Sequence, residues 1–480
     1  MPHPQDRARG EAVRQNRTSA AGPSVPVAPT AAAARAATSA AIPVSTAVLG
    51  PERLPFPVAV AAQSLPSAQP QPARRTGRRA GRILLTLAVL AVAGGAAAVA
   101  LHREEAVPAA SKHLAPVWQI PPSAADDELI GSWLTDKLLI RASTRAGVTA
   151  YDLTDGSVVW SAALPPNAAK SGSRPCAMSP TLTAEGHGTV AFGKDSNSCT
   201  ALAGIDTSTG TILWTMPLVD SAHPTAMSAR TYLQGDVATI VSENFLGGLD
   251  VRTGHRVWGF RPRGYYCNAY DWGADGIIVV DDYCADSKHL FTLTAYDGRT
   301  GKVLWSQTQD AHTDLAHVFS GSPLIASVHK AGQDSVRVFA PSGRSRKLAV
   351  GNTEIAPGNG VAADHSARLV GTVLVTPAQT AGGGEIDAFD TTTGAKLWSY
   401  HATALATATV GDDRIYAVAG PAAAPRLVKL DPRTGHATVA AALPAADHQH
   451  FAAGTVYVTP DGGVLELDAL GTSGGVHFFR

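Results

Sequence analysis

Short apolar runs alternate with polar turns along the chain from residue 114 to its end. One unit recurs with the consensus small–apolar–Asp–x–x–Thr–Gly–x–x–apolar–Trp, at residues 150–160, 204–214, 248–258, 295–305, 388–398 and, more weakly, 429–439. In each copy an apolar run enters a turn at Asp and leaves it after Gly, which tolerates the positive φ that tight turns need. The unit therefore predicts a β-hairpin whose Asp carboxylate accepts hydrogen bonds from the turn.

The spacing of the tryptophans predicts how many hairpins assemble. Steps of 42, 54, 44 and 47 residues separate Trp118, Trp160, Trp214, Trp258 and Trp305. A degenerate copy at 336–343 and the copies ending at Trp398 and Val439 continue the series. One hairpin cannot bury its own apolar faces, but a ring of them can, with each Trp packed between neighbouring sheets. The prediction is an all-β fold, a β-propeller of eight four-stranded blades over 114–480, or seven if the degenerate copy forms no blade.

The two ends of the repeat region complement each other. The strand around Trp118 precedes any complete hairpin, and the last unit, with strands at 455–458 and 463–468, is short of an outer strand. Pairing them closes the ring and removes exposed sheet edges. Residues 476–479 are an alternative source of the missing strand.

The four cysteines fit this frame as two structural disulfides. Cys176 and Cys267 each lie 38 residues before a repeat Trp, and their expected partners, Cys199 and Cys284, fall at the end of the second strand of the same blades. An even, small number of cysteines in a large chain fits an oxidising compartment. Each disulfide is expected to contribute about 3 kcal/mol.

The first 113 residues have a different character. Residues 1–80 are rich in Ala, Pro, Ser and Arg without amphipathic periodicity, which predicts a disordered arm. Five arginines then precede the uncharged run 83–101, long enough as a helix to cross a bilayer. We expect a transmembrane anchor over 81–102 and a linker over 103–113. A signal peptide cleaved after Ala98-Val99-Ala100 is the alternative, although about 70 residues before the basic region are rare for one.

Charge supports this topology. Residues 1–82 hold 11 Arg, no Lys and 3 acidic residues, which leaves 28 basic and 36 acidic residues for the remainder. The positive-inside rule places the N-terminus in the cytoplasm and the propeller outside the cell membrane. A mildly acidic main domain argues against a nucleic-acid partner.

The repeated Asp–x–x–Thr–Gly–x–x–x–Trp motif resembles the PQQ-like (quinoprotein-type) β-propeller repeat over about 370 residues. The resemblance implies the fold strongly and the function weakly, because the family includes PQQ-dependent alcohol dehydrogenases, an outer-membrane assembly scaffold and sensor domains. Its enzymes use adjacent disulfide-bonded cysteines, a calcium ion and a catalytic Asp. Adjacent cysteines and the long inter-blade insertions that cover the cofactor are missing from this chain. We therefore expect no PQQ, no calcium and no catalytic residues.

Two local clusters are candidates for chemistry. Aromatic residues gather around Cys267 and form a candidate binding surface, with core packing as the alternative: Tyr265, Tyr266, Tyr270 and Trp272. Residues 281–286 gather three carboxylates, but their spacing does not match a calcium loop. His448 and His450 are two residues apart, as in half a metal site, yet no third ligand is evident nearby, so no metal is expected.

These observations predict a membrane-anchored extracytoplasmic propeller that acts as a non-catalytic binding or scaffold module for a protein or cell-envelope ligand. Propeller faces present many loops on a rigid ring, which suits binding. The alternatives are a quinoprotein-like oxidoreductase and an extracellular sensor domain.

Overall fold

The computed structural model describes residues 112–122, 124, 126–163, 173–195, 198–220, 229–242, 244–260, 270–274, 276–282, 284–351, 353–355, 367–380, 383–408, 414–445, 454–468 and 475–480. The expected arm and anchor, and the linker up to residue 111, lie outside this part of the chain. Within it, no helix is long and apolar enough to cross a membrane.

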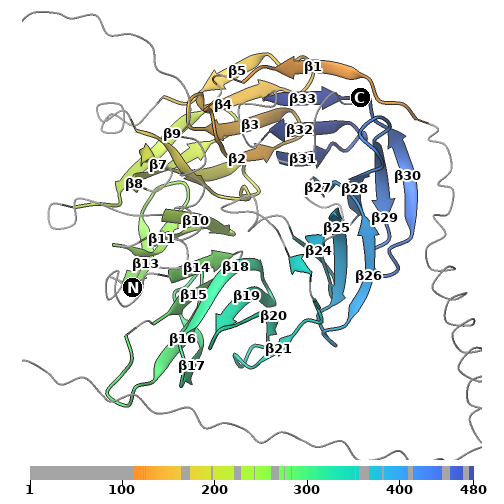
Figure 1. Ribbon diagram of the computed structural model, residues 1–480. Coiled ribbons are helices and arrows are strands. Elements are labelled where there is room, and N and C mark those ends of the chain that lie inside the picture. Colours follow the sequence, from red (N-terminus) through yellow and green to blue (C-terminus); the bar gives the residue numbers. More distant parts are fainter. Residues whose placement is uncertain are drawn as a thin grey trace, which may run out of the picture. The chain divides into compact units, whose positions relative to one another are not determined.

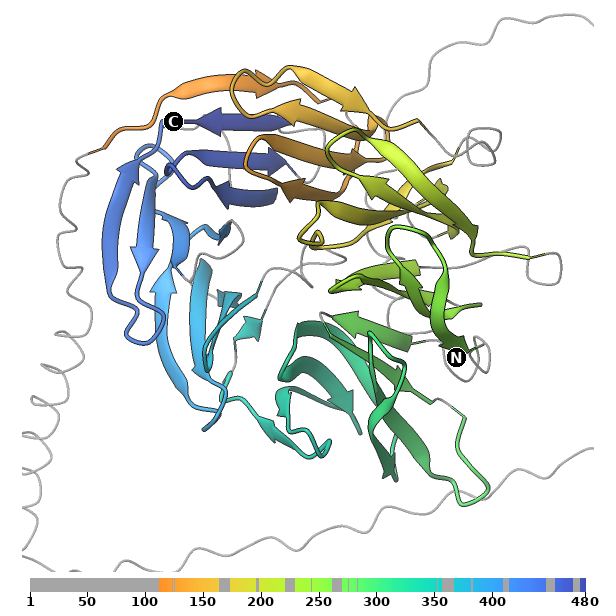
Figure 2. The ribbon, with the colours of Figure 1, turned by 180° about the vertical axis from the view of Figure 1, so that it is seen from behind.

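The strands of the described residues form a β-propeller of eight blades, arranged around a ring in Figures 1 and 2. The first strand of each blade lies nearest the centre of the ring and the last lies at its rim. Blades one to four are β2–β5 (Leu129–Leu134, Leu138–Ser143, Gly147–Asp152, Val158–Ser161), β6–β9 (Arg174–Met178, His187–Asp195, Ser198–Asp206, Thr211–Pro217), β10–β13 (Ala229–Gln234, Val237–Ser242, Leu246–Asp250, Arg256–Phe260) and β14–β17 (Tyr270–Ala274, Ile277–Asp281, Phe291–Asp297, Val303–Gln309).

The degenerate repeat forms a blade of its own, so the ring has eight blades and not seven. It supplies β20 and β21 of blade five, whose outer strand β21 has only three residues. Blades five to seven are β18–β21 (Thr313–Gly321, Leu324–Lys330, Gln333–Phe339, Ser345–Lys347), β22–β26 (Glu354–Ile355, Arg368–Val370, Val373–Thr380, Gly383–Asp390, Lys396–His401) and β27–β30 (Ala404–Ala408, Ile415–Ala419, Arg426–Leu430, Ala437–Ala442). In blade six, the short β22 and β23 both pair with β24.

Blade eight joins the two ends of the described chain. Its strands are β31 (Gly454–Val458), β32 (Val464–Asp468), β33 (Val476–Phe479) and β1 (Pro116–Ile120). β1 pairs antiparallel with β33, with Trp118 opposite Phe478 and Ile120 opposite Val476. The predicted closing strand around Trp118 is thus confirmed as the outer strand of blade eight. Residues 476–479 form the third strand of this blade and do not take the place of the outer strand.

The repeat motif docks one blade onto the next at five seams of the described ring. Trp160 of blade one donates its indole N–H to the carbonyl of Thr207 in blade two at 3.1 Å, and four other repeat tryptophans bond the same position of the following blade at 2.7–3.1 Å. The ring of Trp160 lies against Gly210, where an added Cβ would meet it at 2.5 Å. Gly210 also has φ of +72°. The motif glycine therefore serves both the turn and the contact between blades.

The motif aspartates hold the turns, as the sequence predicts. Asp390 accepts hydrogen bonds from the Thr392 hydroxyl at 2.5 Å and from the backbone N–H groups of Thr392 and Thr393. These hydrogen bonds hold the pKa of the Asp390 carboxyl below its usual value, and the bond from the Thr392 hydroxyl has the largest effect.

A disulfide joins Cys176 in β6 to Cys199 in β8, with the Cα atoms 6.0 Å apart. The prediction that Cys199 ends the second strand is wrong, because β7 and β8 form a hairpin of nine-residue strands and Cys199 lies near the start of the third. Cys284, which follows β15, is disulfide-bonded. Its expected partner, Cys267, lies outside the described residues.

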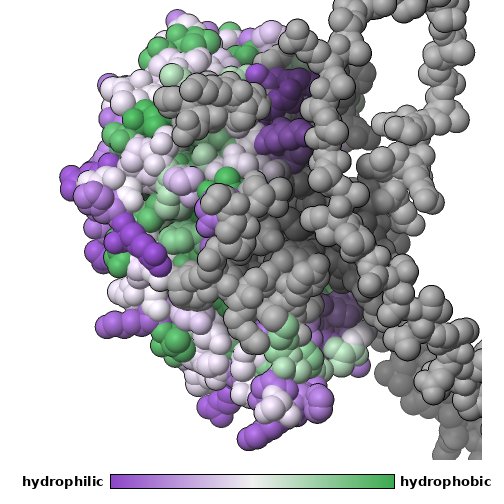
Figure 3. Space-filling view, turned by 90° about the vertical axis from the view of Figure 1, so that its left-hand side faces the viewer, coloured by the Kyte–Doolittle hydropathy of each residue, from purple (hydrophilic) through white to green (hydrophobic). Residues whose placement is uncertain are grey.

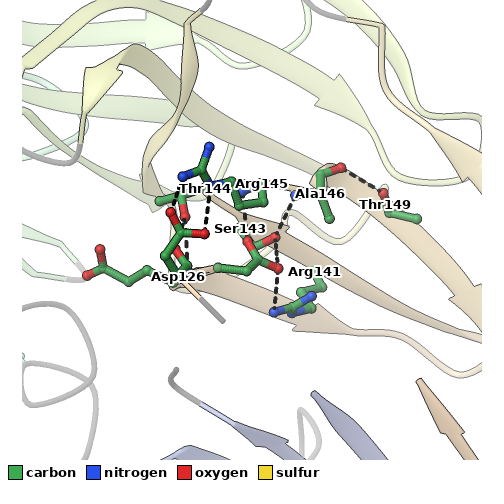
Figure 4. A network of polar contacts seen from close by, with 9 residues as sticks. Asp126, Arg141, Ser143, Thr144, Arg145, Ala146 and Thr149 are labelled. Atoms are coloured by element: carbon green, nitrogen blue, oxygen red, sulfur yellow. Dashed lines mark hydrogen bonds and ion pairs between the residues drawn. The ribbon is translucent and has the colours of Figure 1, made fainter. Parts of the chain in front are cut away.

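A buried polar network fixes the entry into blade one (Figure 4). Asp127 is fully buried and accepts hydrogen bonds from the Arg141 guanidinium (3.2 Å), the Ser143 hydroxyl (3.1 Å) and the Arg145 backbone N–H (2.7 Å). A buried charge is tolerated when it is paired and hydrogen-bonded, and this carboxylate meets both conditions. Arg145 also forms an ion pair with Asp126.

Apolar side chains at the rim are dispersed. The residue before a repeat Trp faces solvent on six outer strands: Val117, Val159, Leu213, Val257, Leu304 and Leu397, with exposed fractions of 37–52%. On the side seen in Figure 3, apolar spots are separated by polar ones. Scattered apolar residues of this kind are ordinary for a protein surface.

Candidate functional site

The candidate site lies at one end of blade four, next to the strand that carries two residues of the predicted aromatic surface. Tyr270 and Trp272 are the first and third residues of β14, the inner strand of this blade. Tyr270 stands opposite Asp281, the last residue of β15, in the antiparallel ladder. Tyr265 and Tyr266 lie outside the described residues. The register therefore brings Tyr270 of the predicted aromatic segment beside Asp281, the first residue of the acidic segment 281–286.

The three carboxylates of the acidic segment have separate roles. Asp282 accepts the backbone N–H of Cys284 at 2.9 Å, and Asp286 accepts those of Lys288 (2.7 Å) and Leu290 (3.0 Å). Both aspartates thus cap local turns. Asp281 is different, because it is 1% exposed and belongs to a cluster built from two blades.

That cluster consists of Asp281, His312 and Asp314. His312 lies in the connection from β17 to β18, and Asp314 is the second residue of β18 in blade five. The imidazole Nε2 is 3.7 Å from Oδ2 of Asp281, and its Nδ1 is 3.2 Å from Oδ1 of Asp314. One potential ligand atom from each residue lies within 4.8 Å of the other two. The imidazole ring therefore lies between two carboxylates across the seam of two blades.

The surroundings of the cluster are partly apolar. A small pocket beside it is lined by Asp281, Phe291, Thr292, Leu293, Gln309, Ala311, His312 and Thr313. Phe291 presents an edge-to-face contact to the imidazole, with the ring centroids 5.7 Å apart. Gln309 accepts hydrogen bonds from the Thr313 hydroxyl and from Lys330, both at 2.7 Å, which ties the end of β17 to blade five. Of these contacts, the one with Phe291 touches the imidazole ring directly.

Sequence reasoning identified Asp281 within its acidic segment but missed His312 and Asp314. The two residues are about 30 positions downstream and outside the repeat motif, and only the packing of blade four against blade five brings them to Asp281. The run Asp310-Ala311-His312-Thr313-Asp314, which combines a histidine with flanking acids just before a strand, is the signal that was present. His448 and His450 lie outside the described residues.

Comparisons with known proteins agree with the architecture. A family model described as outer membrane protein assembly factor BamB matches residues 202–358 and 382–473. No curated protein sequence matches the chain. Among solved structures, the computationally designed Ika8 protein is 12% identical with a TM-score of 0.50, covering 75% of this chain and 98% of that one, which supports the fold.

Two natural structures are also similar. BamB from Moraxella catarrhalis is 16% identical with a TM-score of 0.43, covering 76% of this chain and 97% of that one. The quinohemoprotein alcohol dehydrogenase from Comamonas testosteroni is 14% identical with a TM-score of 0.45, covering 78% of each chain.

Proposed function

Because the chain belongs to the family of the outer membrane protein assembly factor BamB, we propose that its propeller is a non-catalytic module that binds a protein or cell-envelope ligand. The observation that carries this proposal is the family match over residues 202–358 and 382–473. The blade-to-blade docking supports it, since a ring fixed by repeated Trp contacts offers its loops as a pre-organised surface.

We further propose that the propeller works outside the cytoplasm, tethered by residues 81–102. The uncharged run after five arginines supports a single-pass anchor with a cytoplasmic N-terminus. The disulfide between Cys176 and Cys199 supports an oxidising compartment. A protease added to intact spheroplasts should digest the propeller and leave a protected N-terminal fragment. Full protection of the propeller would contradict this topology.

Site-directed photo-crosslinking tests the binding role and its location together. A photoreactive residue at exposed Lys288, in the β15–β16 connection that follows Asp281, should capture a defined protein or envelope component in intact cells. The matched control is the same residue at Val158, which is 59% exposed on the outer strand of blade one. Mass spectrometry then identifies the adducts. Equal adduct patterns from both positions would contradict a binding surface at blade four.

A quinoprotein-like oxidoreductase is the competing function, and it is tested on the purified full chain. Incubation with PQQ and calcium should produce neither stoichiometric absorbance of bound quinone nor dye reduction with alcohols or sugars. Stoichiometric binding together with substrate-dependent dye reduction would overturn the non-catalytic proposal.

A further inference from the structure

We propose that Asp281, His312 and Asp314 form a binding site for a divalent transition-metal ion, with Zn²⁺ as the ion that fits best. The site lies at the seam of blades four and five, and its residues come from β15, from the β17–β18 connection and from β18. It goes beyond the proposed binding function, because the ion site and a protein-binding surface are independent properties.

The position of the imidazole assigns the direct ligands. His312 Nε2 and Asp281 Oδ2 are 3.7 Å apart, which is longer than a hydrogen bond. Two ligand atoms on one tetrahedral zinc ion, each bonded at about 2.0–2.1 Å, lie about 3.3 Å apart. A movement of a few tenths of an ångström therefore lets both atoms bind one ion, and we assign Nε2 and the Asp281 carboxylate as its direct protein ligands.

Asp314 has the role of a positioning residue. A histidine that binds a metal through Nε2 carries a proton on Nδ1, and that N–H is usually donated to a carboxylate or carbonyl. Asp314 Oδ1 lies 3.2 Å from Nδ1, at hydrogen-bonding distance. In the proposed site the Nδ1–H group is donated to Asp314 and the lone pair of Nε2 binds the ion, while the edge-to-face contact with Phe291 restrains the same ring.

Burial and ligand type narrow the choice of ion. The side chain of Asp281 is 2% exposed, whereas those of His312 and Asp314 are 18% and 26% exposed, so the cluster opens to solvent on the His312 side. Calcium and magnesium prefer sites made of oxygen ligands only, while an imidazole together with a carboxylate suits Zn²⁺ and its neighbours.

Zinc titration of the full chain tests the site. The chain carries His448→Ala and His450→Ala to remove the histidine pair near residue 450, is freed of any affinity tag, and is stripped with a chelator. Calorimetry and competition with a chromogenic chelator should then give one Zn²⁺ per chain, and the unfolding temperature should rise with Zn²⁺ but not with Ca²⁺. Co²⁺ in place of Zn²⁺ should give the visible absorption of a bound imidazole–carboxylate complex.

Four substitutions in that background assign the ligands. Asp281→Asn and His312→Gln should each weaken Zn²⁺ binding by 100-fold or more, and Asp314→Asn by about 10–100-fold, the usual effect of removing an orienting carboxylate. The control is His329→Gln, which removes an exposed histidine whose Nδ1 is 2.7 Å from Asp334 in blade five, and it should leave binding unchanged. Circular dichroism confirms that each variant is folded. Asp281→Asn and His312→Gln test the two ligands separately, so the proposal can still be tested if one of these variants does not fold. Absence of a stoichiometric Zn²⁺, or unchanged binding in a folded Asp281→Asn or His312→Gln variant, would overturn the proposal.

Discussion

The contact between a repeat Trp and the next blade predicts different costs for two chemically identical substitutions. Gly210 and Gly147 both have positive φ, +72° and +73°, so Gly→Ala forces a Cβ into the left-handed region at either position. This conformational cost is about 1–2 kcal/mol. At Gly147 nothing lies within 4 Å of the added Cβ, whereas at Gly210 the Trp160 ring lies at 2.5 Å.

The ring contact adds a second cost at Gly210 alone. Overpacking of a filled contact costs about 1–3 kcal/mol. A displaced Trp160 also loses its 3.1 Å hydrogen bond to the Thr207 carbonyl, a bond of about 1 kcal/mol. We therefore expect Gly147→Ala to lower the free energy of unfolding by about 1–2 kcal/mol and Gly210→Ala, with the overpacking and the lost hydrogen bond added, by about 3–6 kcal/mol.

Urea denaturation followed by far-UV circular dichroism measures the difference, with wild type and both variants under the same conditions. Trp160→Leu tests the cause, because it removes the ring and should bring the effect of Gly210→Ala down to that of Gly147→Ala. Equal losses in the two glycine variants of the otherwise wild-type chain would refute the reasoning and leave the motif glycine with a turn-forming role only.

Three further predictions concern the disulfide, the ring closure and acid stability. Replacement of Cys176 and Cys199 by Ser should lower the unfolding free energy by about 3 kcal/mol. A reductant should then lower the stability of this variant less than that of wild type. An unchanged midpoint of urea denaturation in the variant would contradict the prediction. Deletion of residues 1–120, which removes β1, should expose the edge of β33 and cause self-association in gel filtration, unlike deletion of residues 1–111. The hydroxyl of Ser208 holds the pKa of Asp206 below its usual value. The ionised Asp206 carboxylate therefore stabilises the folded state above pH about 4, and this contribution is lost as the pH falls through the lowered pKa. Asp206→Asn should flatten the decline of stability measured between pH 5 and 3, and an unaltered slope would count against it.

The propeller could be predicted because its signal is local and repeated. Five of the hairpins carry the full Asp turn and Trp, so the spacing predicted eight blades, with seven as the alternative, and the closing strand around Trp118. The partner carbonyl of each Trp could not be predicted, because it depends on how neighbouring blades are rotated against each other. The strand position of Cys199 was wrong for a related reason, since β7 and β8 are longer than the other hairpin strands suggest.

The candidate site was only partly predictable. The acidic segment that contains Asp281 is visible in the sequence. The sequence does not show that Asp282 and Asp286 cap local turns while Asp281 belongs to the cluster with His312 and Asp314. His312 and Asp314 carry no motif and reach Asp281 through the packing of successive blades. Contacts between blades thus set the site chemistry, whereas contacts within a hairpin set the fold.

Blade eight has a consequence for the order in which the protein is made. β1 emerges first among the strands, yet its hydrogen-bonded neighbour is β33, and Pro116 meets Phe479 in the ladder. During synthesis the other blades can form one after another, while β1 can pair only after residues 476–479 have been made. Any translation arrest or C-terminal truncation leaves this first strand without its neighbour. Completion of the ring therefore depends on residues 476–479, in whatever order the other blades form.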